Sequence, residues 1–331
     1  MASLLEKATR GERARIEALI AREEARVRSA FRRFLDSVQS NDARRQVRLA
    51  LEREGIEMAL RVVDAHVARM GGVIAQVFQS AGTAEAAALA GKLRSRHSYV
   101  AISFDPTYPR AADLMRRNTL SFVRGFTGAQ RESTRAALTE ALRTGAGTVQ
   151  TARMLRESIG LTETQRRAVE NYRSLLEDGD VQALSRDLRD RRFDSSVLRA
   201  VEDGEPLGAE KIARMVEQYR NRYLQYRAET IARTETLRVV GQARLEALEQ
   251  TLEQIELPRS RAVRIWAATQ DERTRDTHSE MDGQRVGLDE PFVTPDGYNL
   301  LFPGDGSLGA PASEIVNCRC TEYHEILEDD E

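Results

Sequence analysis

The chain has 331 residues, of which 31% are charged and only 5% aromatic, a mixture that favours long amphipathic helices over a β-sandwich. No apolar run approaches the roughly 18–20 residues that a membrane-spanning helix needs, and the N-terminal segment MASLLEKATRGERARIE is charged throughout. We therefore expect no membrane association and no secretory signal, and a protein made and folded in a cytoplasm. The two cysteines exclude a disulfide framework.

The net charge of −2 hides an asymmetry, because residues 1–200 carry about +10 and residues 201–331 about −12. Nearly all the positive charge is arginine, which binds phosphate and carboxylate groups in a bidentate way. One interpretation is that the N-terminal part contacts an acidic partner, either DNA or an acidic protein surface. The alternative, which the interleaved acidic residues favour, is a set of solvated helix faces.

The first hundred residues predict helix. Residues 3–39 place apolar side chains at helical spacing, Ser40 or Asn41 offers a cap, and a second helix follows to about Gly71. An Ala-rich helix comes next. SYVAISF then alternates as a strand does, and DPTYP is a turn, so we predict a boundary or a docking segment near residues 97–110.

Helical patterns resume from about residue 108. Thr127 is a plausible cap, and Gly145 or Gly147 a stop. The polar stretch after residue 178 predicts a helical hairpin or an extended arm. Residues 208–250 give the longest helix signal of the chain, although Gly241 interrupts it, and Pro258 ends it.

The pattern changes near Arg261. RAVRIWAAT, QRVGL, PFVT and TEYHEI are strand-like, and a short helix or turn is expected in DERTRDTHSEMDG. The fold class predicted is mainly α, an elongated helical N-terminal region followed by a small α+β C-terminal domain. We divide the chain into an unassigned Arg-rich helical region (1–100), a helical body ending in a long helix (101–258) and a small α+β module (259–331).

This module holds the only tryptophan, both cysteines and two of the four histidines. Cys318, Cys320 and His324, with His278 upstream, form a reasonable four-ligand set for zinc, because thiolates and imidazoles are the donors that zinc prefers. The spacing of the cysteines is tighter than the common C-x2-C pair. The alternative is that the cysteines alternate on a strand and pack in a small core, with His324 at the surface.

A polar cluster precedes the cysteines. His278 with Asp271 or Asp282 is a candidate acid–base pair, and Arg273 or Arg275 a candidate anion-binding group, as in a hydrolase or nuclease-like site. The alternative is a network of ion pairs and caps that fixes a turn. We favour the second interpretation, because no phosphate-binding loop or activated nucleophile accompanies the cluster.

Four segments together carry a family resemblance: IARTETLRVVGQAR, WAATQDERTRDTHSEMDG, a Pro-containing FPGD segment and NCRC. The chain resembles the phage Mu F-like minor head proteins, also called phage head morphogenesis proteins, over about residues 115–325 and most specifically over 230–321. The residues that match the family signature, besides His278, Cys318 and Cys320, are Arg233, Thr234, Glu235, Asp271, Arg273, Thr274, Arg275, Asp282, Gly283, Pro303, Asn317 and Arg319.

The resemblance implies a non-enzymatic minor head protein in the virion of a tailed phage or phage-derived particle, made in the cytoplasm of the bacterial host. It further implies a role in head morphogenesis at the portal vertex or capsid interior. The implied partners are the portal protein and other capsid subunits, and some members bind DNA. The Cys/His content of the family agrees with the zinc interpretation. Some members carry a toxin-like domain after NCRC, and we expect none here. The alternative function is the hydrolase or nuclease-like domain that uses His278, Asp271 and Arg273.

Overall fold

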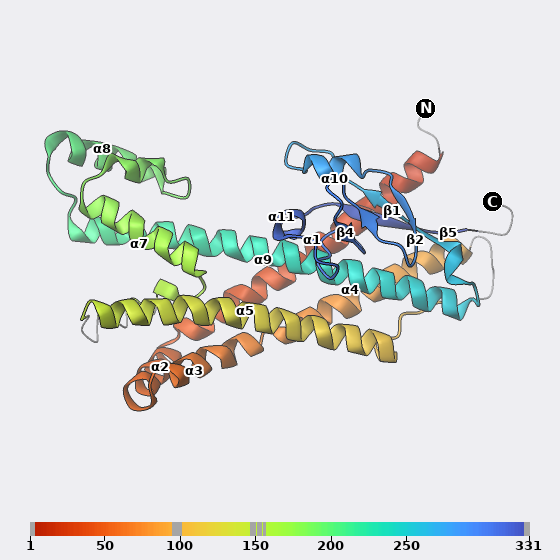
Figure 1. Ribbon diagram of the computed structural model, residues 1–331, viewed down its shortest axis with the longest axis horizontal. Helices are drawn as coiled ribbons and strands as arrows, with labels where there is room; N and C mark the ends of the chain where they lie inside the picture. Colours follow the sequence, from red (N-terminus) through yellow and green to blue (C-terminus); the bar gives the residue numbers. More distant parts are fainter. Residues whose placement is uncertain (1–3, 95–100, 146–149, 151–153, 155–156, 328–331) are drawn as a thin grey trace. The chain divides into compact units, whose positions relative to one another are not determined.

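The computed structural model describes residues 4–94, 101–145, 150, 154 and 157–327 (Figure 1). Long helices fill most of the chain and a small sheet lies near its C-terminus, so the predicted fold class is confirmed. The chain forms two compact units, the first from residues 1–30, 71–122 and 230–331 and the second from residues 31–70 and 123–229. These units group segments that are distant in sequence. The division into the consecutive regions 1–100, 101–258 and 259–331 stays a prediction.

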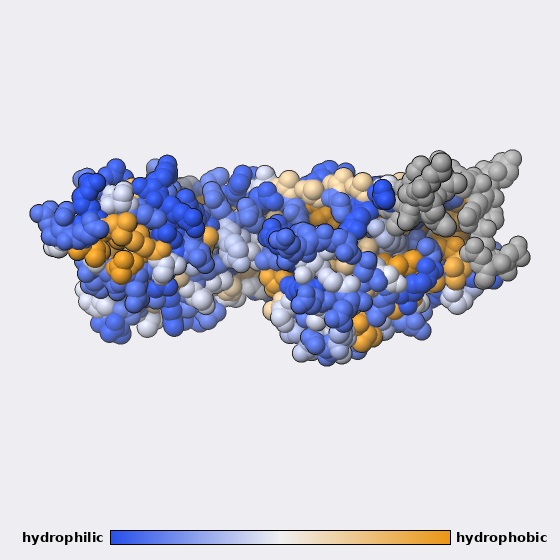
Figure 2. Space-filling view, turned by 90° about the horizontal axis from the view of Figure 1, so that it is seen from above, coloured by the Kyte–Doolittle hydropathy of each residue, from blue (hydrophilic) through white to orange (hydrophobic). Residues whose placement is uncertain are grey.

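Three long helices contribute residues to both units: α1 (Leu4–Gln39), α5 (Pro109–Arg143) and α9 (Ala209–Gln254). Among the residues that the structure describes, no helix is long and apolar enough to cross a membrane. Figure 2 shows a face that is mostly hydrophilic, with scattered apolar groups, as expected of long amphipathic helices.

In the first unit, α4 (Gly71–Arg94) carries the Ala-rich sequence. The segment predicted to be strand-like forms no strand over its described residues 101–104, which corrects the prediction. It is bound to α9 instead: the backbone N–H groups of Ser103 and Asp105 donate to the side-chain oxygens of Gln254 (3.0 Å) and Gln250 (2.8 Å). The side-chain N–H groups of the same two glutamines donate in turn to the backbone carbonyls of Asp105 and Ser103. Two glutamines therefore satisfy the backbone as a neighbouring strand would. The predicted docking segment is present, although it is not β.

The C-terminal module of the first unit contains a three-stranded antiparallel sheet in the order β2-β1-β5, with β1 at Ala262–Ala267, β2 at Arg285–Gly287 and β5 at Thr321–Ile326. The pair β3 (Phe292–Val293) and β4 (Asn299–Leu300) forms a second, two-stranded sheet. Three short helical segments complete the module: η3 (Arg259–Arg261), α10 (Asp276–Glu280) and α11 (Ala312–Ile315). The strands predicted in RAVRIWAAT, QRVGL, PFVT and TEYHEI are confirmed.

Helix α9 provides one wall of the module's core. Leu237 packs in the same apolar cluster as Trp266 and Phe292. Gly241 does not interrupt the helix; its role is to admit Phe302, since a Cβ atom at position 241 would lie 2.5 Å from Cδ2 of that ring. A glycine here costs helix propensity but lets the module pack closely against α9.

The second unit contains α2 (Asn41–Glu54), α3 (Ile56–Ala68), α7 (Glu163–Glu177) and α8 (Asp194–Asp203), with two 3₁₀ turns, η1 (Val181–Ser185) and η2 (Arg191–Phe193). Ser40 caps α2 as predicted, by accepting from the backbone N–H of Ala43. The predicted single helix to Gly71 is broken at Gly55, whose φ of 86° is left-handed. Thr127 is no cap, because α5 continues through it, and the helix ends just before Gly145.

Candidate metal centre

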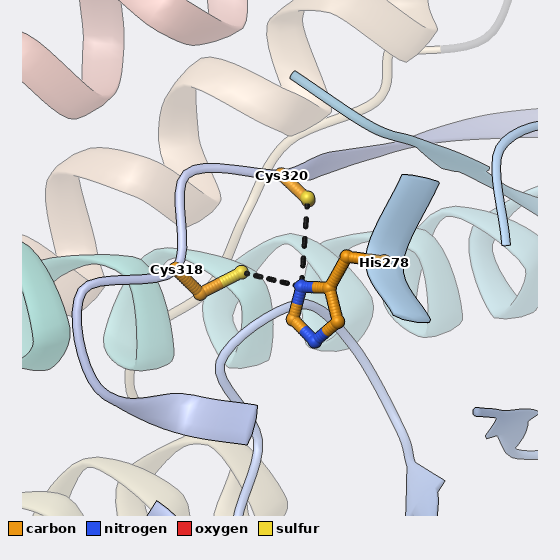
Figure 3. A group of neighbouring side chains, drawn as sticks. All are labelled: His278, Cys318 and Cys320. Atoms are coloured by element: carbon orange, nitrogen blue, oxygen red, sulfur yellow. Dashed lines mark hydrogen bonds between the residues drawn. The ribbon is translucent and has the colours of Figure 1, made fainter. Parts of the chain in front are cut away.

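Three predicted ligands meet in the core of the C-terminal module. His278 comes from α10, and Cys318 and Cys320 come from the segment that leads into β5. Figure 3 shows both sulfur atoms directed at the same ring nitrogen of His278, with Cys318 Sγ 3.5 Å and Cys320 Sγ 3.7 Å from Nδ1. All three side chains are buried, and their ligand atoms lie within 4.8 Å of one another.

These distances fit a tetrahedral ion. With Zn–S bonds of about 2.3 Å and Zn–N bonds of about 2.0–2.1 Å, neighbouring sulfur and nitrogen ligands of a tetrahedral zinc lie about 3.6 Å apart. The observed separations of 3.5 and 3.7 Å match this value. A neutral imidazole has a single lone pair, so only one of the two thiols could donate a hydrogen bond to Nδ1. One ion in contact with both sulfurs and Nδ1 would satisfy all three groups.

The second ring nitrogen of His278 has a different partner. Its Nε2 lies 3.0 Å from Oε2 of Glu314, a residue of α11 that is itself buried. The indole ring of Trp266 stands against the imidazole at 5.2 Å between centroids and an angle of 83°. The edge-on contact with Trp266 and the carboxylate of Glu314 leave Nδ1 facing the sulfurs.

The thiols are held so that one of them ionises readily. A hydrogen bond from Cys318 and one with His278 lower the pKa of Cys320 to about 5, against the effect of burial. The hydrogen bond to Cys320, together with burial, raises the pKa of Cys318 well above its ordinary value. The pair is therefore biased towards one thiolate, which is the form that binds metal. The positive charge of Arg275 further favours ionisation of Cys318.

His324 does not join this group, so the structure brings together only three of the four predicted ligands. Its ring is fully buried between two carboxylates, with Nδ1 2.9 Å from Glu85 and Nε2 3.3 Å from Glu322. Strand geometry explains the separation, since four residues along an extended chain span about 13 Å. His324 is thus neither a neighbour of the cysteines nor, as the alternative held, a surface residue.

The signature residues of α9 hold the cysteine-bearing loop. The hydroxyl oxygen of Thr234 accepts a hydrogen bond from the backbone N–H of Asn317 (3.1 Å), and Arg233 donates to the Asn317 side chain (3.5 Å). Asn317 has a left-handed φ of 60°, a conformation in which asparagine is among the more tolerated residues. Glu235 pairs with Arg238 one turn along the helix (2.7 Å).

The other signature residues fasten the loop before α10. Asp271 accepts from Arg319 (2.5 Å) and from the backbone N–H of Arg273 (3.0 Å), and the hydrogen bond from Arg319 lowers the pKa of Asp271 well below its ordinary value. Asp282 accepts from the backbone N–H of Ala268 (2.8 Å). Two further hydrogen bonds are of the same kind: Thr274 donates to the Thr269 carbonyl, and Arg275 donates to the Val316 carbonyl. Of the other signature residues, Gly283 has a left-handed φ of 79°, and Pro303 is buried next to Phe302 in the chain.

These contacts match the structural interpretation of the polar cluster. Asp271 pairs with Arg319, whereas His278 contacts the cysteines and Glu314, so the members of the candidate acid–base pair have different partners. Sequence reasoning missed Glu314, although it lies only four residues before Cys318, and Glu85, which lies in the Ala-rich helix α4 far from the cysteine motif in sequence. No local pattern marks either residue.

Residues 191–323 match the family described as phage Mu protein F like protein. The chain is 31% identical over 100 residues to minor head protein GP7 of Bacillus phage SPP1, which is 30% of each chain. It is also 48% identical over 56 residues to an NAD(+)–arginine ADP-ribosyltransferase, EFV, of Enterococcus faecalis, which is 17% of this chain and 11% of that protein.

The aligned stretches thus cover about a tenth and about a third of these two relatives. No solved structure matches the chain. The family match is narrower than the range of 115–325 predicted from the sequence, but it contains His278, Cys318 and Cys320 and the whole of α9. Residues 191–323 are thus similar to the phage Mu protein F like family.

Proposed function

We propose that the chain is a structural, non-catalytic minor head protein of a tailed phage or phage-derived particle. It acts in head morphogenesis at the portal vertex or capsid interior, where its partners are the portal protein and other capsid subunits. The observation that carries this proposal is the family match over residues 191–323, with the similarity to a phage minor head protein as further support. The use of the polar signature residues as caps and ion pairs agrees with a structural role.

The virion location is tested in the phage or prophage that encodes the chain. Heads and tails are separated on a density gradient and the chain is detected by mass spectrometry in each fraction. We expect it in the heads, at a low copy number, and cross-linked to the portal protein after treatment with an amine- or carboxyl-reactive reagent. A chain absent from purified heads contradicts the proposal. A chain that is present but cross-linked only to other capsid subunits contradicts the portal contact alone.

We also propose that His278, Cys318 and Cys320 hold one zinc ion that stabilises the C-terminal module. The fit of the ligand distances to a tetrahedral ion and the readily ionised thiol pair support this proposal. The bound ion would cross-link α10 to the segment before β5 and so contribute folding free energy to a module with a small apolar core.

The zinc is measured in the full-length protein by elemental analysis. We expect about one zinc per chain, lost in Cys318→Ser and in Cys320→Ser, together with a lower melting temperature in the presence of a chelator. His66→Gln is the control, because His66 lies in α3 and bonds Ser37 rather than the cysteines. A protein free of metal whose melting curve ignores the chelator contradicts the zinc site and leaves the head role intact.

Contact with packaged DNA is a separate part of the proposal, and the excess of arginine in residues 1–200 supports it. If DNA binds, its affinity falls steeply with salt concentration. The hydrolase or nuclease-like alternative predicts turnover of nucleic acid that vanishes in His278→Ala. We carry no ADP-ribosyl transfer over to this chain, since the shared stretch is only 11% of that relative.

A further inference from the structure

We propose that Glu314 is a positioning residue for the metal centre: its carboxylate accepts a hydrogen bond from Nε2–H of His278 and so presents Nδ1 to the ion. This inference rests on the proposed zinc site and deepens it. The observation behind it is the 3.0 Å contact between Nε2 and Glu314 Oε2, on the side of the ring opposite the two sulfurs.

The two ring nitrogens are chemically distinct, and the hydrogen bond at one decides which of them is free to bind metal. A carboxylate oxygen accepts hydrogen bonds, so its 3.0 Å contact with Nε2 favours the tautomer in which Nε2 carries the hydrogen. Nδ1 then keeps its lone pair, and this lone pair faces Cys318 and Cys320. A ring turned by half a rotation would instead direct a carbon atom at the sulfurs. The perpendicular indole of Trp266 restricts that rotation.

The burial of Glu314 argues that this contact is functional. Only 5% of the residue is exposed, and the side-chain partners that it contacts are Thr277 (3.3 Å) and His278. Burial of a carboxyl group is costly unless its oxygen atoms accept hydrogen bonds, and His278 faces one of these oxygen atoms. A divalent ion bound at Nδ1 would make the imidazole a stronger hydrogen-bond donor to Glu314 and would offset negative charge in the site.

The position of Glu314 in the chain couples it to the ligands. Glu314 lies in α11, four residues before Cys318. Its backbone N–H donates to the carbonyl of Pro311 (2.9 Å). One short segment therefore supplies both the first sulfur ligand and the carboxylate that orients the imidazole. A displacement of α11 would move both groups away from His278 together.

The test compares full-length wild-type protein with Glu314→Ala and Glu314→Gln, and uses Glu280→Ala as the control because Glu280 is an exposed residue of α10. Zinc affinity is measured by competition with a chromophoric chelator. We expect Glu314→Ala to weaken zinc binding by about 10–100-fold, as for other outer-sphere partners of metal-bound histidines. The zinc affinity of Glu314→Gln should lie between those of Glu314→Ala and the wild type, because the amide oxygen still accepts from Nε2–H but carries no negative charge. The control should bind as the wild type does.

A spectroscopic measurement separates positioning from general stability. The ¹⁵N NMR signals of the His278 ring in the zinc-loaded wild type should show a metal-bound Nδ1 and a protonated Nε2. Cobalt-substituted Glu314→Gln should keep the sulfur-to-metal charge-transfer absorption of two thiolates, which shows that the ligands themselves are intact.

The outcomes are distinguishable. A wild-type protein that binds no zinc defeats the proposed site itself. A wild type that binds zinc through Nε2, or a folded Glu314→Ala whose zinc affinity equals that of the wild type, overturns the role of Glu314 and leaves the site standing. If Glu314→Ala does not fold, the ring signals of the wild type and the affinity of Glu314→Gln decide the question.

Discussion

The backbone N–H of Asn317 donates to the hydroxyl oxygen of Thr234 at 3.1 Å, although the two residues are 83 positions apart. Thr234 lies on α9 and Asn317 directly precedes Cys318, so this hydrogen bond joins the long helix to the loop that carries the two cysteines. The signature segments RTE and NCRC thus meet in space. Their joint presence in the family match has a physical reason: one segment holds the other in place.

Thr234→Val should weaken this attachment while keeping the shape of the side chain. The change removes the acceptor of the Asn317 amide, and an unpaired amide in a half-buried position costs about 1–3 kcal/mol of the free energy of unfolding. The measurement is urea unfolding followed by the fluorescence of Trp266, the only tryptophan. Thr234→Ser is the matched control, because it keeps the hydroxyl group. Equal stability of the valine and serine variants would show that the hydrogen bond contributes nothing.

Gly241→Ala should destabilise the protein although alanine is the better helix former by about 1 kcal/mol. The added Cβ would lie 2.5 Å from the ring of Phe302, and overpacking of this kind costs about 1–3 kcal/mol. The control is Gly91→Ala in α4, where an added Cβ would have no neighbour within 4 Å. In thermal unfolding, Gly241→Ala should melt at a lower temperature than the wild type. Gly91→Ala should melt at the wild-type temperature or above it. The opposite order would contradict the close approach of Phe302.

The separate positions of the two histidines predict different metal contents. His278→Ala should lose the bound zinc, because it removes the nitrogen that both sulfurs face. His324→Gln should keep about one zinc per chain, since the ring nitrogens of His324 lie beside the carboxylates of Glu85 and Glu322 instead. Elemental analysis of both purified variants checks the prediction. Loss of zinc from His324→Gln in a folded protein would restore the four-ligand set expected from the sequence.

The sequence predicted the type of most elements correctly because their periodicity is strong. The apolar spacing of residues 3–39 and 208–250 indicated α1 and α9, and the alternation in RAVRIWAAT and TEYHEI indicated β1 and β5. SYVAISF misled for the opposite reason: the alternation of Ile102 and Phe104 reflects burial of these residues in an extended segment that is bonded to α9 by glutamine side chains. Local pattern cannot distinguish such a segment from a strand.

The candidate site was only partly predictable. The rarity of cysteine, histidine and tryptophan in the chain drew attention to His278, Cys318 and Cys320, and the structure brings these three together. The short spacing in sequence predicts that His324 also lies near the cysteines, but the extended chain of β5 carries it away from them. Glutamate is a common residue type in this chain, so rarity does not mark Glu314. Its place beside His278 depends on how α10 and α11 pack, which a single sequence does not reveal.

Glu85 gives the last prediction, a dependence of stability on acid. It is buried in α4 and bonds Arg244 of α9 (2.9 Å) and His324 (2.9 Å). Burial alone would raise the pKa of Glu85, but the charge of Arg244 and the bond with His324 hold this pKa well below its ordinary value. A depressed pKa means that the ion pair contributes fully to stability above the unfolded value of about 4.3, and that this contribution is lost as the pH falls below it.

Glu85→Gln should therefore unfold more easily than the wild type near neutral pH, by about 3–5 kcal/mol, because it leaves the buried Arg244 without its counter-charge. The difference should shrink as the pH is lowered from 5 to about 3, because the unfolded wild-type chain then takes up a proton at Glu85 that the folded chain resists, and this lowers the free energy of unfolding of the wild type. Urea unfolding at a series of pH values measures it. Glu325→Gln is the control: Glu325 pairs with Arg285 at the surface of β5 (2.6 Å), where an ion pair contributes at most about 1 kcal/mol. If the loss in free energy of unfolding caused by Glu85→Gln stays constant with pH, the shape of Glu85, and not its charge, stabilises the protein.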